Sequence, residues 1–419
     1  PDTPGETVMI FNIYLTNLLR ALSLALELSD GGLSRHHWRT AMIADRIAMH
    51  IGLPHSERQT LLYAALLHDI GAAANWEERR NLYHHQPVPD LKHHAEAGYL
   101  LLKDSRHFKA MALPIRHHHD YWDGSTPSIL AGRDIPLLSR ILCLADTLEV
   151  LLKDNTYILD QRDSVMATVV SGSGTKFDPD LVRSLEELSK QECFWLDLTN
   201  PHYYSTFFQS TYSFGQVYLN IDDVLDVADI FATIIDRTSR YTARHSRSVA
   251  EVAAFLAKVK GYSDAEVKLM RIAGLLHDLG KLTVPNAILE KPGRLTEREF
   301  SIMKQHVYYS YRILNQIDGF NIIAEWAAFH HETLNGTGYP FRIDKSSLRL
   351  GSRIVAVADV FAALVEDRPY RPALSVEEVE GIMSRMVAEE KLDGNLVHDL
   401  FAHGELLYSI ARGNEGTKG

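Results

Sequence analysis

The stretch Gly274-Leu-Leu-His-Asp-Leu-Gly-Lys281 decides the fold of this chain. Its adjacent His277 and Asp278 interrupt an apolar run, and both side chains are costly to bury unless something binds them. A metal ion would satisfy both, because neutral imidazole and carboxylate are common protein ligands for metals. We therefore expect this stretch to lie at a metal site.

Further candidate ligands surround the stretch at spacings that helices can bring together: His245, His306, His330, His331 and Asp359. A lone buried histidine is more often a satisfied core residue than a ligand. One core rarely needs so many imidazoles, however, and imidazole with carboxylate favours iron, manganese, zinc or nickel over magnesium or calcium. A bridging carboxylate would allow two ions about 3.5–4 Å apart, a pair that clamps a phosphate and generates hydroxide for in-line attack on phosphorus.

The same pattern occurs earlier, around Ala65-Leu-Leu-His-Asp-Ile-Gly-Ala72. His277 minus His68 is 209 residues, and the later candidate ligands are offset by 212 or 213. A nearly constant offset indicates an internal duplication. The earlier candidate ligands are His36, His68, Asp69, His94, His118, His119 and Asp146.

The periodicity of the chain predicts an all-α fold. Apolar residues recur at spacings of three and four, and no alternating run is long enough for a substantial sheet. We expect tandem helical domains, each built around a helix-borne His/Asp metal site. Residues 1–196 form the first, 197–217 a connector and 218–419 the second. The polar, His-rich stretch from Trp76 to Pro89 is predicted to be a loop.

Composition narrows the class of protein. The net charge of −11 argues against a protein that coats a nucleic-acid polymer. Two cysteines, Cys143 and Cys193, are too few for a disulfide framework. The apolar stretch from Met9 to Leu28 is interrupted by polar residues, which predicts an amphipathic core helix and no membrane association. No signal peptide is visible, so we expect a cytoplasmic protein.

Two motifs of the second copy go beyond metal ligands: His277-Asp-Leu-Gly-Lys281 and His330-His-Glu-Thr-Leu-Asn-Gly-Thr-Gly-Tyr-Pro340. With Thr242–Val249 and Asp367–Pro372, they make residues 218–403 resemble the HD-GYP family of cyclic dinucleotide phosphodiesterases, a branch of the HD phosphohydrolases. The resemblance implies that a cyclic dinucleotide, cyclic di-GMP or 3′,3′-cyclic GMP-AMP, is opened to a linear 5′-phosphorylated product. It also implies two divalent ions, iron or manganese first and zinc or nickel as alternatives, and leaves a homodimer open.

The resemblance also assigns roles to residues. One ion would be held by His245, His277, Asp278 and Asp359, and the other by Asp278, His306, His330 and His331. Asp278 would bridge the ions together with the attacking hydroxide, while Lys281 would neutralise phosphate or protonate the leaving oxygen. The candidate substrate contacts, besides Lys281, are Gly338, Tyr339, Pro340, Arg342 and Arg371. Some relatives support a third ion with a carboxylate where this chain has Tyr241, so we predict two.

The first copy keeps its candidate ligands but loses other parts of the motif. Ala72 stands opposite Lys281, Ser125-Thr-Pro127 opposite the Gly-Tyr-Pro loop, and Arg371 aligns near Ile158. We therefore predict a regulatory or structural role for this copy and leave metal binding open. Two alternatives to a cyclic dinucleotide phosphodiesterase are a cyclic dinucleotide receptor without turnover and an HD phosphohydrolase for another nucleotide. Lys281 weighs against the first and the Gly-Tyr-Pro loop against the second.

Overall fold

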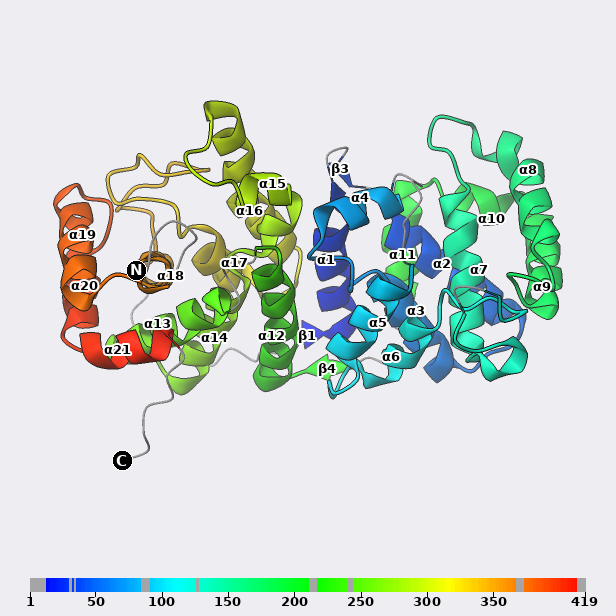
Figure 1. The fold of residues 1–419 in the computed structure, drawn as a ribbon, viewed down its shortest axis with the longest axis horizontal. Coiled ribbons are helices and arrows are strands. Elements are labelled where there is room, and N and C mark those ends of the chain that lie inside the picture. Colours follow the sequence, from blue (N-terminus) through cyan, green and yellow to red (C-terminus); the bar gives the residue numbers. More distant parts are fainter. Residues whose placement is uncertain are drawn as a thin grey trace. The chain divides into compact units, whose positions relative to one another are not determined.

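The computed structural model describes residues 13–29, 32–33, 35–83, 91–125, 128–210, 217–239, 244–366 and 373–412. Helices dominate these ranges, which confirms the predicted all-α class (Figure 1). The strands within them are two residues long: Ile13–Tyr14 (β1), Leu28–Ser29 (β2), Gly32–Leu33 (β3) and Tyr218–Leu219 (β4). β2 pairs antiparallel with β3, with Leu28 opposite Leu33, and β1 pairs with β4.

The described chain divides into two compact units. The N-terminal unit spans Tyr14–Val217, and the C-terminal unit begins at Tyr218 and also includes Ile13. The boundary expected at residue 196 falls inside a helix, Glu192–Asp197. Within the expected connector, Tyr204 and Phe208 are buried, and their ring centroids lie 6.0 and 5.1 Å from that of Trp38. The helix that carries these aromatics therefore packs within the N-terminal unit.

The helices of the N-terminal unit run in chain order from α1 to α11 (Figure 1). Their bounds are α1 Leu15–Glu27, α2 His36–His50, α3 His55–Leu67, α4 Trp76–Tyr83, α5 Leu91–Leu102, α6 Lys109–Arg116, the 3₁₀ turn η1 Gly132–Asp134, α7 Leu137–Val150, α8 Ile158–Ser171, α9 Pro179–Ser189, α10 Glu192–Asp197 and α11 Pro201–Ser210. α2 packs against α3, α7 and α9, and α5 packs against α6. Residues of α1 are almost all buried, as expected for an amphipathic core helix.

The loop predicted from Trp76 to Pro89 is wrong over its first part, because Trp76–Tyr83 forms α4. Asn75 accepts a hydrogen bond from the backbone N–H of Glu78 at 3.2 Å, and Glu77 and Glu78 lie in the first turn, where acidic side chains favour a helix. The buried Trp76 attaches the helix to the core. Residues 84–89 of the predicted loop lie outside the described residues.

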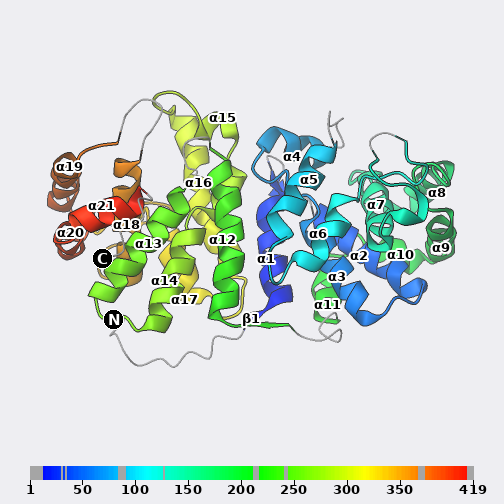
Figure 2. The same ribbon diagram turned by 60° about the horizontal axis from the view of Figure 1, so that its bottom comes forward.

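The helices of the C-terminal unit run from α12 to α21 (Figure 2). Their bounds are α12 Ile221–Arg237, α13 His245–Val259, α14 Asp264–Leu276, the 3₁₀ turn η3 Leu279–Thr283, α15 Asn286–Leu289, α16 Glu297–Leu314, α17 Asn321–Ala328, α18 Leu350–Val365, α19 Val376–Ala388, α20 Gly394–Phe401 and α21 Gly404–Ala411. α13 packs against α14 and α18, α17 packs against α14, α16 and α18, and α16 packs against η3.

Local sequence signals fix where several of these helices begin. Capping boxes start α12 at Asn220, α14 at Ser263, α16 at Thr296 and α19 at Ser375. In each box the side chain accepts a bond from the backbone three residues later, which satisfies an orphan N–H of the first turn. Small residues then allow close packing: a Cβ on Gly274 would lie 2.5 Å from Cα of Ala250. α14 is thereby held against α13, with its C-terminal end at the unit's polar centre.

The structure holds no helix, within the residues it describes, that is long and apolar enough to cross a membrane.

Candidate active site

The His277-Asp278 pair lies where α14 ends. His277 is the C-cap of α14, and Asp278 occupies the turn that leads into η3. Gly280 in η3 faces the backbone of α16, where a Cβ would lie 1.9 Å from the carbonyl oxygen of His306. Ser310 completes the junction, since it donates to the His277 carbonyl at 3.0 Å and accepts from the Gly280 N–H at 2.9 Å. The glycine of the motif is thus required for η3 to approach α16.

The remaining candidate ligands reach the pair from neighbouring elements. His245 begins α13, His306 lies on α16, His330 and His331 follow α17, and Asp359 lies on α18. Figure 2 shows these helices gathered in one unit. Donor atoms lie within 4.8 Å of one another in three groups: His245, His277 and Asp359; His277, Asp278 and His330; and His306, His330 and His331. The structure therefore brings together all seven residues predicted as ligands.

The two carboxylate oxygens of Asp278 face different histidines. Its Oδ2 lies 3.1 Å from His277 Nε2, and its Oδ1 lies 3.4 Å from His306 Nε2. On the first side, Asp359 Oδ1 lies 3.1 Å from His245 Nε2. This arrangement suits a carboxylate that bridges two ions.

Backbone carbonyls orient the imidazoles. Nδ1 of His277 lies 2.7 Å from the oxygen of Gly274, and the rings of His306 and His330 each lie 2.6 Å from the carbonyl three residues earlier. A carbonyl only accepts, so Nδ1 of each ring donates and Nε2 keeps its lone pair. The Nε2 atoms of these three histidines are buried and have no hydrogen-bond partner. Unpartnered, convergent lone pairs beside carboxylates fit a metal centre.

The charges of the site follow from the same surroundings. Burial lowers the pKa of His306 to about 3 and also lowers those of His330 and His331, so these rings are neutral at pH 7, the form that can bind a metal. Burial alone would raise the pKa of Asp278, but His277 and Lys281 outweigh it and hold that pKa well below its usual range. His245 is the exception among the imidazoles. Burial opposes its charge, yet hydrogen bonds to Asp359 and Glu366 raise its pKa to about 10.

Four candidate substrate-binding residues, Lys281, Gly338, Tyr339 and Pro340, lie beside this centre. The Lys281 ammonium pairs with Oδ2 of Asp278. Half-buried Tyr339 packs on His331, with ring centroids 4.9 Å apart, and is joined to Pro340 by a cis peptide bond. A Cβ on Gly338 would lie 2.5 Å from Cα of Glu332, so the loop passes very close to the His-His-Glu segment.

Of the two candidate arginines and Tyr241, the structure describes only Arg342. Arg342 is exposed and adopts a left-handed backbone with φ of 56°. Arg371 and Tyr241 lie outside the described residues.

Sequence reasoning missed Glu332, which directly follows the double histidine. Its buried carboxylate accepts backbone N–H groups from Phe341, Arg342 and Ile343 at 2.7, 3.1 and 3.0 Å. Glu332 thereby attaches the Gly-Tyr-Pro loop to the histidine segment. No signal in the motif marks Glu332, because its partners are backbone N–H groups, which the sequence does not reveal.

The N-terminal unit assembles a comparable set at the end of α3. His36, His37, His68 and Asp69 form one group with donor atoms within 4.8 Å, and His94, His118 and His119 form another. Asp146 Oδ1 lies 3.3 Å from His36 Nε2. The earlier candidate ligands are therefore also brought together, and His37 is an addition that the sequence comparison did not identify.

The N-terminal unit also has a carboxylate that accepts backbone N–H groups of the following loop, but that loop lacks a counterpart of Arg342. Asp120, which corresponds to Glu332 at the offset of the double histidines, accepts backbone bonds from Ile129 at 2.9 Å and Leu130 at 3.0 Å. With the loop one residue shorter, Ile129 takes the place of Arg342. The N-terminal unit therefore keeps the carboxylate that holds the loop, Asp120, but has no arginine at the position of Arg342.

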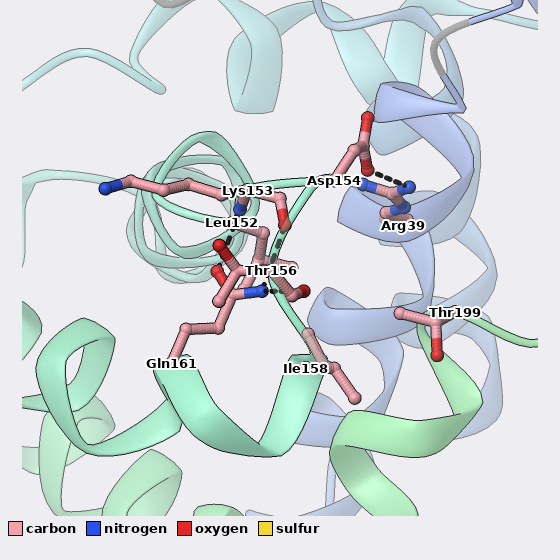
Figure 3. A pocket seen from close by; sticks show the side chains of 8 residues that line it. All are labelled: Arg39, Leu152, Lys153, Asp154, Thr156, Ile158, Gln161 and Thr199. Carbon is pink, nitrogen blue, oxygen red and sulfur yellow. Dashed lines mark hydrogen bonds and ion pairs between the residues drawn. The ribbon is translucent and has the colours of Figure 1, made fainter.

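The N-terminal unit also contains a cavity of about 210 Å³, lined in part by Arg39, Lys153 and Gln161 (Figure 3). Arg39 pairs with Glu149 at 3.3 Å and with Asp154 at 2.8 Å. Gln161 closes the neighbouring loop through bonds to the backbone of Lys153 and Thr156. The arginine of this cavity is therefore already paired with two carboxylates.

Comparison with known proteins identifies the class of protein. A family model described as HD domain matches the chain twice, over residues 20–181 and 229–396. The 3′3′-cGAMP-specific phosphodiesterase 1 of Vibrio cholerae is 30% identical over 97% of this chain and 96% of its own length. Phosphodiesterase 3 of the same organism, also named 3′3′-cGAMP-specific, is 29% identical over 93% of each chain.

A solved structure agrees with the sequence relatives. The crystal structure of the cyclic GMP-AMP-specific phosphodiesterase V-cGAP3 of V. cholerae superposes with a TM-score of 0.65 at 25% identity, covering 97% of this chain and 99% of that one. The chain therefore belongs to the HD domain family. Within it, these relatives confirm the resemblance to the HD-GYP phosphodiesterases.

Proposed function

We propose that the C-terminal unit hydrolyses a cyclic dinucleotide to a linear 5′-phosphorylated dinucleotide in a metal-dependent reaction. The observation that carries the proposal is the Asp278 carboxylate, whose two oxygens face separate histidine groups beside Lys281. The full-length similarity to cyclic dinucleotide phosphodiesterases supports it.

The residues fit two divalent ions. The first would be held by His245, His277, Asp278 and Asp359, and the second by Asp278, His306, His330 and His331. Once bound, such ions supply Lewis acidity and a nucleophile derived from water at neutral pH. Iron or manganese is the leading choice and zinc or nickel the alternative, since imidazole and carboxylate suit all four.

The chain's own residues then position the substrate. Lys281, whose ammonium lies beside Asp278, would neutralise the scissile phosphate or protonate the leaving oxygen. Tyr339, packed on His331, offers a ring face to a base, and Gly338 and Pro340 set the path of its loop. Exposed Arg342 provides a cation at the rim, and Arg371 completes the proposed phosphate contacts. Positioning and charge stabilisation are most of phosphoryl-transfer catalysis.

Among cyclic dinucleotides, 3′,3′-cyclic GMP-AMP is the proposed preferred substrate. The relatives that match this chain over nearly its whole length are named for that nucleotide. Cyclic di-GMP is the alternative, and subsequent cleavage to mononucleotides stays open.

Turnover by the purified full chain tests this function. With Mn²⁺ or Fe²⁺, incubation with a panel of cyclic dinucleotides is expected to yield the linear product, identified by mass. Binding of a cyclic dinucleotide without hydrolysis under any of the four metals would favour a receptor. Hydrolysis of another phosphoester alone would favour a different HD phosphohydrolase.

The N-terminal unit, Tyr14–Val217, is proposed to be regulatory or structural. It lacks counterparts of Lys281 and Arg342, having Ala72 and Ile129 at those positions. A homodimer is a further prediction, which sedimentation velocity of the purified chain tests.

A further inference from the structure

His37 has no counterpart among the ligands of the C-terminal unit. It lies in the first turn of α2, directly after His36, and is fully buried at 0% exposure. At the offset of 209 that relates His36 to His245, the C-terminal unit has Ser246. Ser246 serves a purely local role there, because its backbone N–H and its hydroxyl both donate to Asp236, at 3.1 and 2.7 Å.

The imidazole of His37 converges with two others on one carboxylate oxygen. Oδ2 of Asp69 lies 3.6 Å from the Nε2 atoms of both His36 and His37. The same oxygen lies 3.4 Å from His68 Nε2. Bonds of about 2.1 Å in a tetrahedral site place ligand atoms about 3.4 Å apart. The spacing around Asp69 therefore suits one ion bound by all four side chains.

A buried carboxylate supports His37 from behind. Oε1 of Glu27, fully buried on α1, accepts the backbone N–H of His37 at 2.5 Å and lies 3.6 Å from its Nδ1. Glu27 stands at the position of Asp236 in the other copy, since 236 minus 27 is again 209. The Asp–Ser pair of one copy is thus a Glu–His pair in the other. Through the backbone bond Glu27 fixes the first turn of α2, from which the His37 ring projects; at 3.6 Å its carboxylate is beyond hydrogen-bond length from Nδ1.

We propose that the N-terminal unit binds a divalent transition ion of the zinc type through His36, His37, His68 and Asp69, with Glu27 as a positioning residue. Three imidazoles and a carboxylate fill a four-coordinate shell, and Asp146, 3.3 Å from His36 Nε2, covers it further. Structural sites are closed in this way, whereas catalytic sites keep a position for water or substrate. The ion is therefore structural, and it is distinct from the ions proposed for hydrolysis.

Metal content tests this site without any measurement of hydrolysis. The full chain with Asp278→Asn and His330→Ala disables the C-terminal set. We expect this chain to retain Zn²⁺ through gel filtration and to bind it tightly in competition with a chromophoric chelator. His37→Ser, which installs the residue of the other copy, should weaken that affinity at least about tenfold. His50→Ser, at the exposed end of the same helix, should not change it.

Two further measurements keep the result interpretable. His37→Gln provides a second variant of similar size, and circular dichroism reports whether each variant is folded. Co²⁺ bound to the Asp278→Asn, His330→Ala chain should show the intense visible absorption of four-coordinate cobalt. The proposal is overturned if this chain binds no Zn²⁺ or Co²⁺, or if both folded His37 variants bind Zn²⁺ as tightly as their parent.

Discussion

Lys281 is the difference between the two copies that bears most directly on the proposed cleavage of phosphate. Both copies hold the His-Asp pair among buried imidazoles, but Ala72 replaces the lysine in the N-terminal copy. A cation beside the scissile phosphate stabilises charge that develops in the transition state.

Lys281→Ala is accordingly expected to lower kcat by about 10²–10³-fold. Metal content should be unchanged, because Lys281 is not a ligand. Lys268→Ala is the matched control: this lysine lies on α14, pairs with Asp222 at 2.6 Å and should be dispensable for turnover. Steady-state kinetics with metal analysis of each variant measures the effect. A Lys281→Ala enzyme within about threefold of wild type would remove Lys281 from the proposed chemistry.

Glu332 is expected to position the substrate loop without touching metal. Glu332→Ala leaves three backbone N–H groups without their acceptor, each worth about 1–3 kcal/mol when buried. We predict a rise in KM of about tenfold or more and retained metal. Asp120→Asn changes the corresponding carboxylate of the N-terminal unit, which accepts backbone N–H groups of its own loop, and should leave KM unchanged. Equal KM values for Glu332→Ala and wild type would show that this anchor does not shape the substrate site.

Metal binding to the C-terminal set should depend on pH through His245. Its pKa is raised to about 10 in the metal-free protein, so this ring is protonated at pH 7 and must lose a proton to become a ligand. The apparent metal affinity should therefore rise with pH up to about 10. The stability of the metal-free protein should change with pH in the opposite direction. The protonated His245 ring stabilises the fold fully below about pH 6.5, the ordinary pKa of histidine, and this stabilisation is lost as the pH rises through about 10.

Calorimetric titration of metal in buffers of different ionisation enthalpy measures the released proton. Glu366→Gln, which removes one partner of His245, should reduce the release at neutral pH. Proton release that is absent in wild type would contradict the charged state of His245.

At the scale of elements, the contact between η3 and α16 is the tightest constraint on the site. A Cβ on Gly280 would lie 1.9 Å from the His306 carbonyl oxygen, which belongs to backbone and cannot yield without moving α16. Gly280→Ala is therefore expected to destabilise the protein by about 1–3 kcal/mol or more and to weaken metal binding.

Gly381→Ala is the matched control for that substitution. Gly381 lies within α19, where an added Cβ meets nothing within 4 Å. Alanine should stabilise this helix by up to about 1 kcal/mol. Urea denaturation of the two variants measures both changes, and a Gly280→Ala protein as stable as wild type would show that η3 can shift freely.

The elements predicted from sequence were those with strong apolar periodicity. α4 was mistaken for a loop because its helical signals are polar: Asn75 as a cap and acidic residues in the first turn. α8 shows the limit of that signal: its buried positions, Ile158, Gln161, Val165 and Val169, are spaced by three and four, but the polar Gln161 interrupts the apolar pattern.

The candidate ligands could be predicted because their spacing repeats between the two copies. Residues that differ between the copies could not be predicted in this way. Glu332 was inconspicuous because its partners are backbone N–H groups, which leave no mark in the sequence. His37 was hidden because its counterpart, Ser246, is not a ligand. Comparison of the copies reveals shared chemistry more readily than divergence.

At the scale of the whole molecule, each of the two copies has a cluster of buried histidines and aspartates, but the residues around the two clusters differ. The C-terminal unit has Lys281 and the anchored Gly-Tyr-Pro loop, whereas the N-terminal unit has His37 and Glu27. The central claim is that only the C-terminal unit hydrolyses the cyclic dinucleotide.

Turnover of 3′,3′-cyclic GMP-AMP by full chains carrying Asp278→Asn or Asp69→Asn tests this claim most directly. Both substitutions change one buried carboxylate at equivalent positions, and circular dichroism checks that each protein is folded. We predict that Asp278→Asn lowers kcat by at least about 10³-fold, while Asp69→Asn retains hydrolysis at a level similar to wild type. Loss of hydrolysis in folded Asp69→Asn with activity retained in Asp278→Asn would contradict the assignment of the active unit.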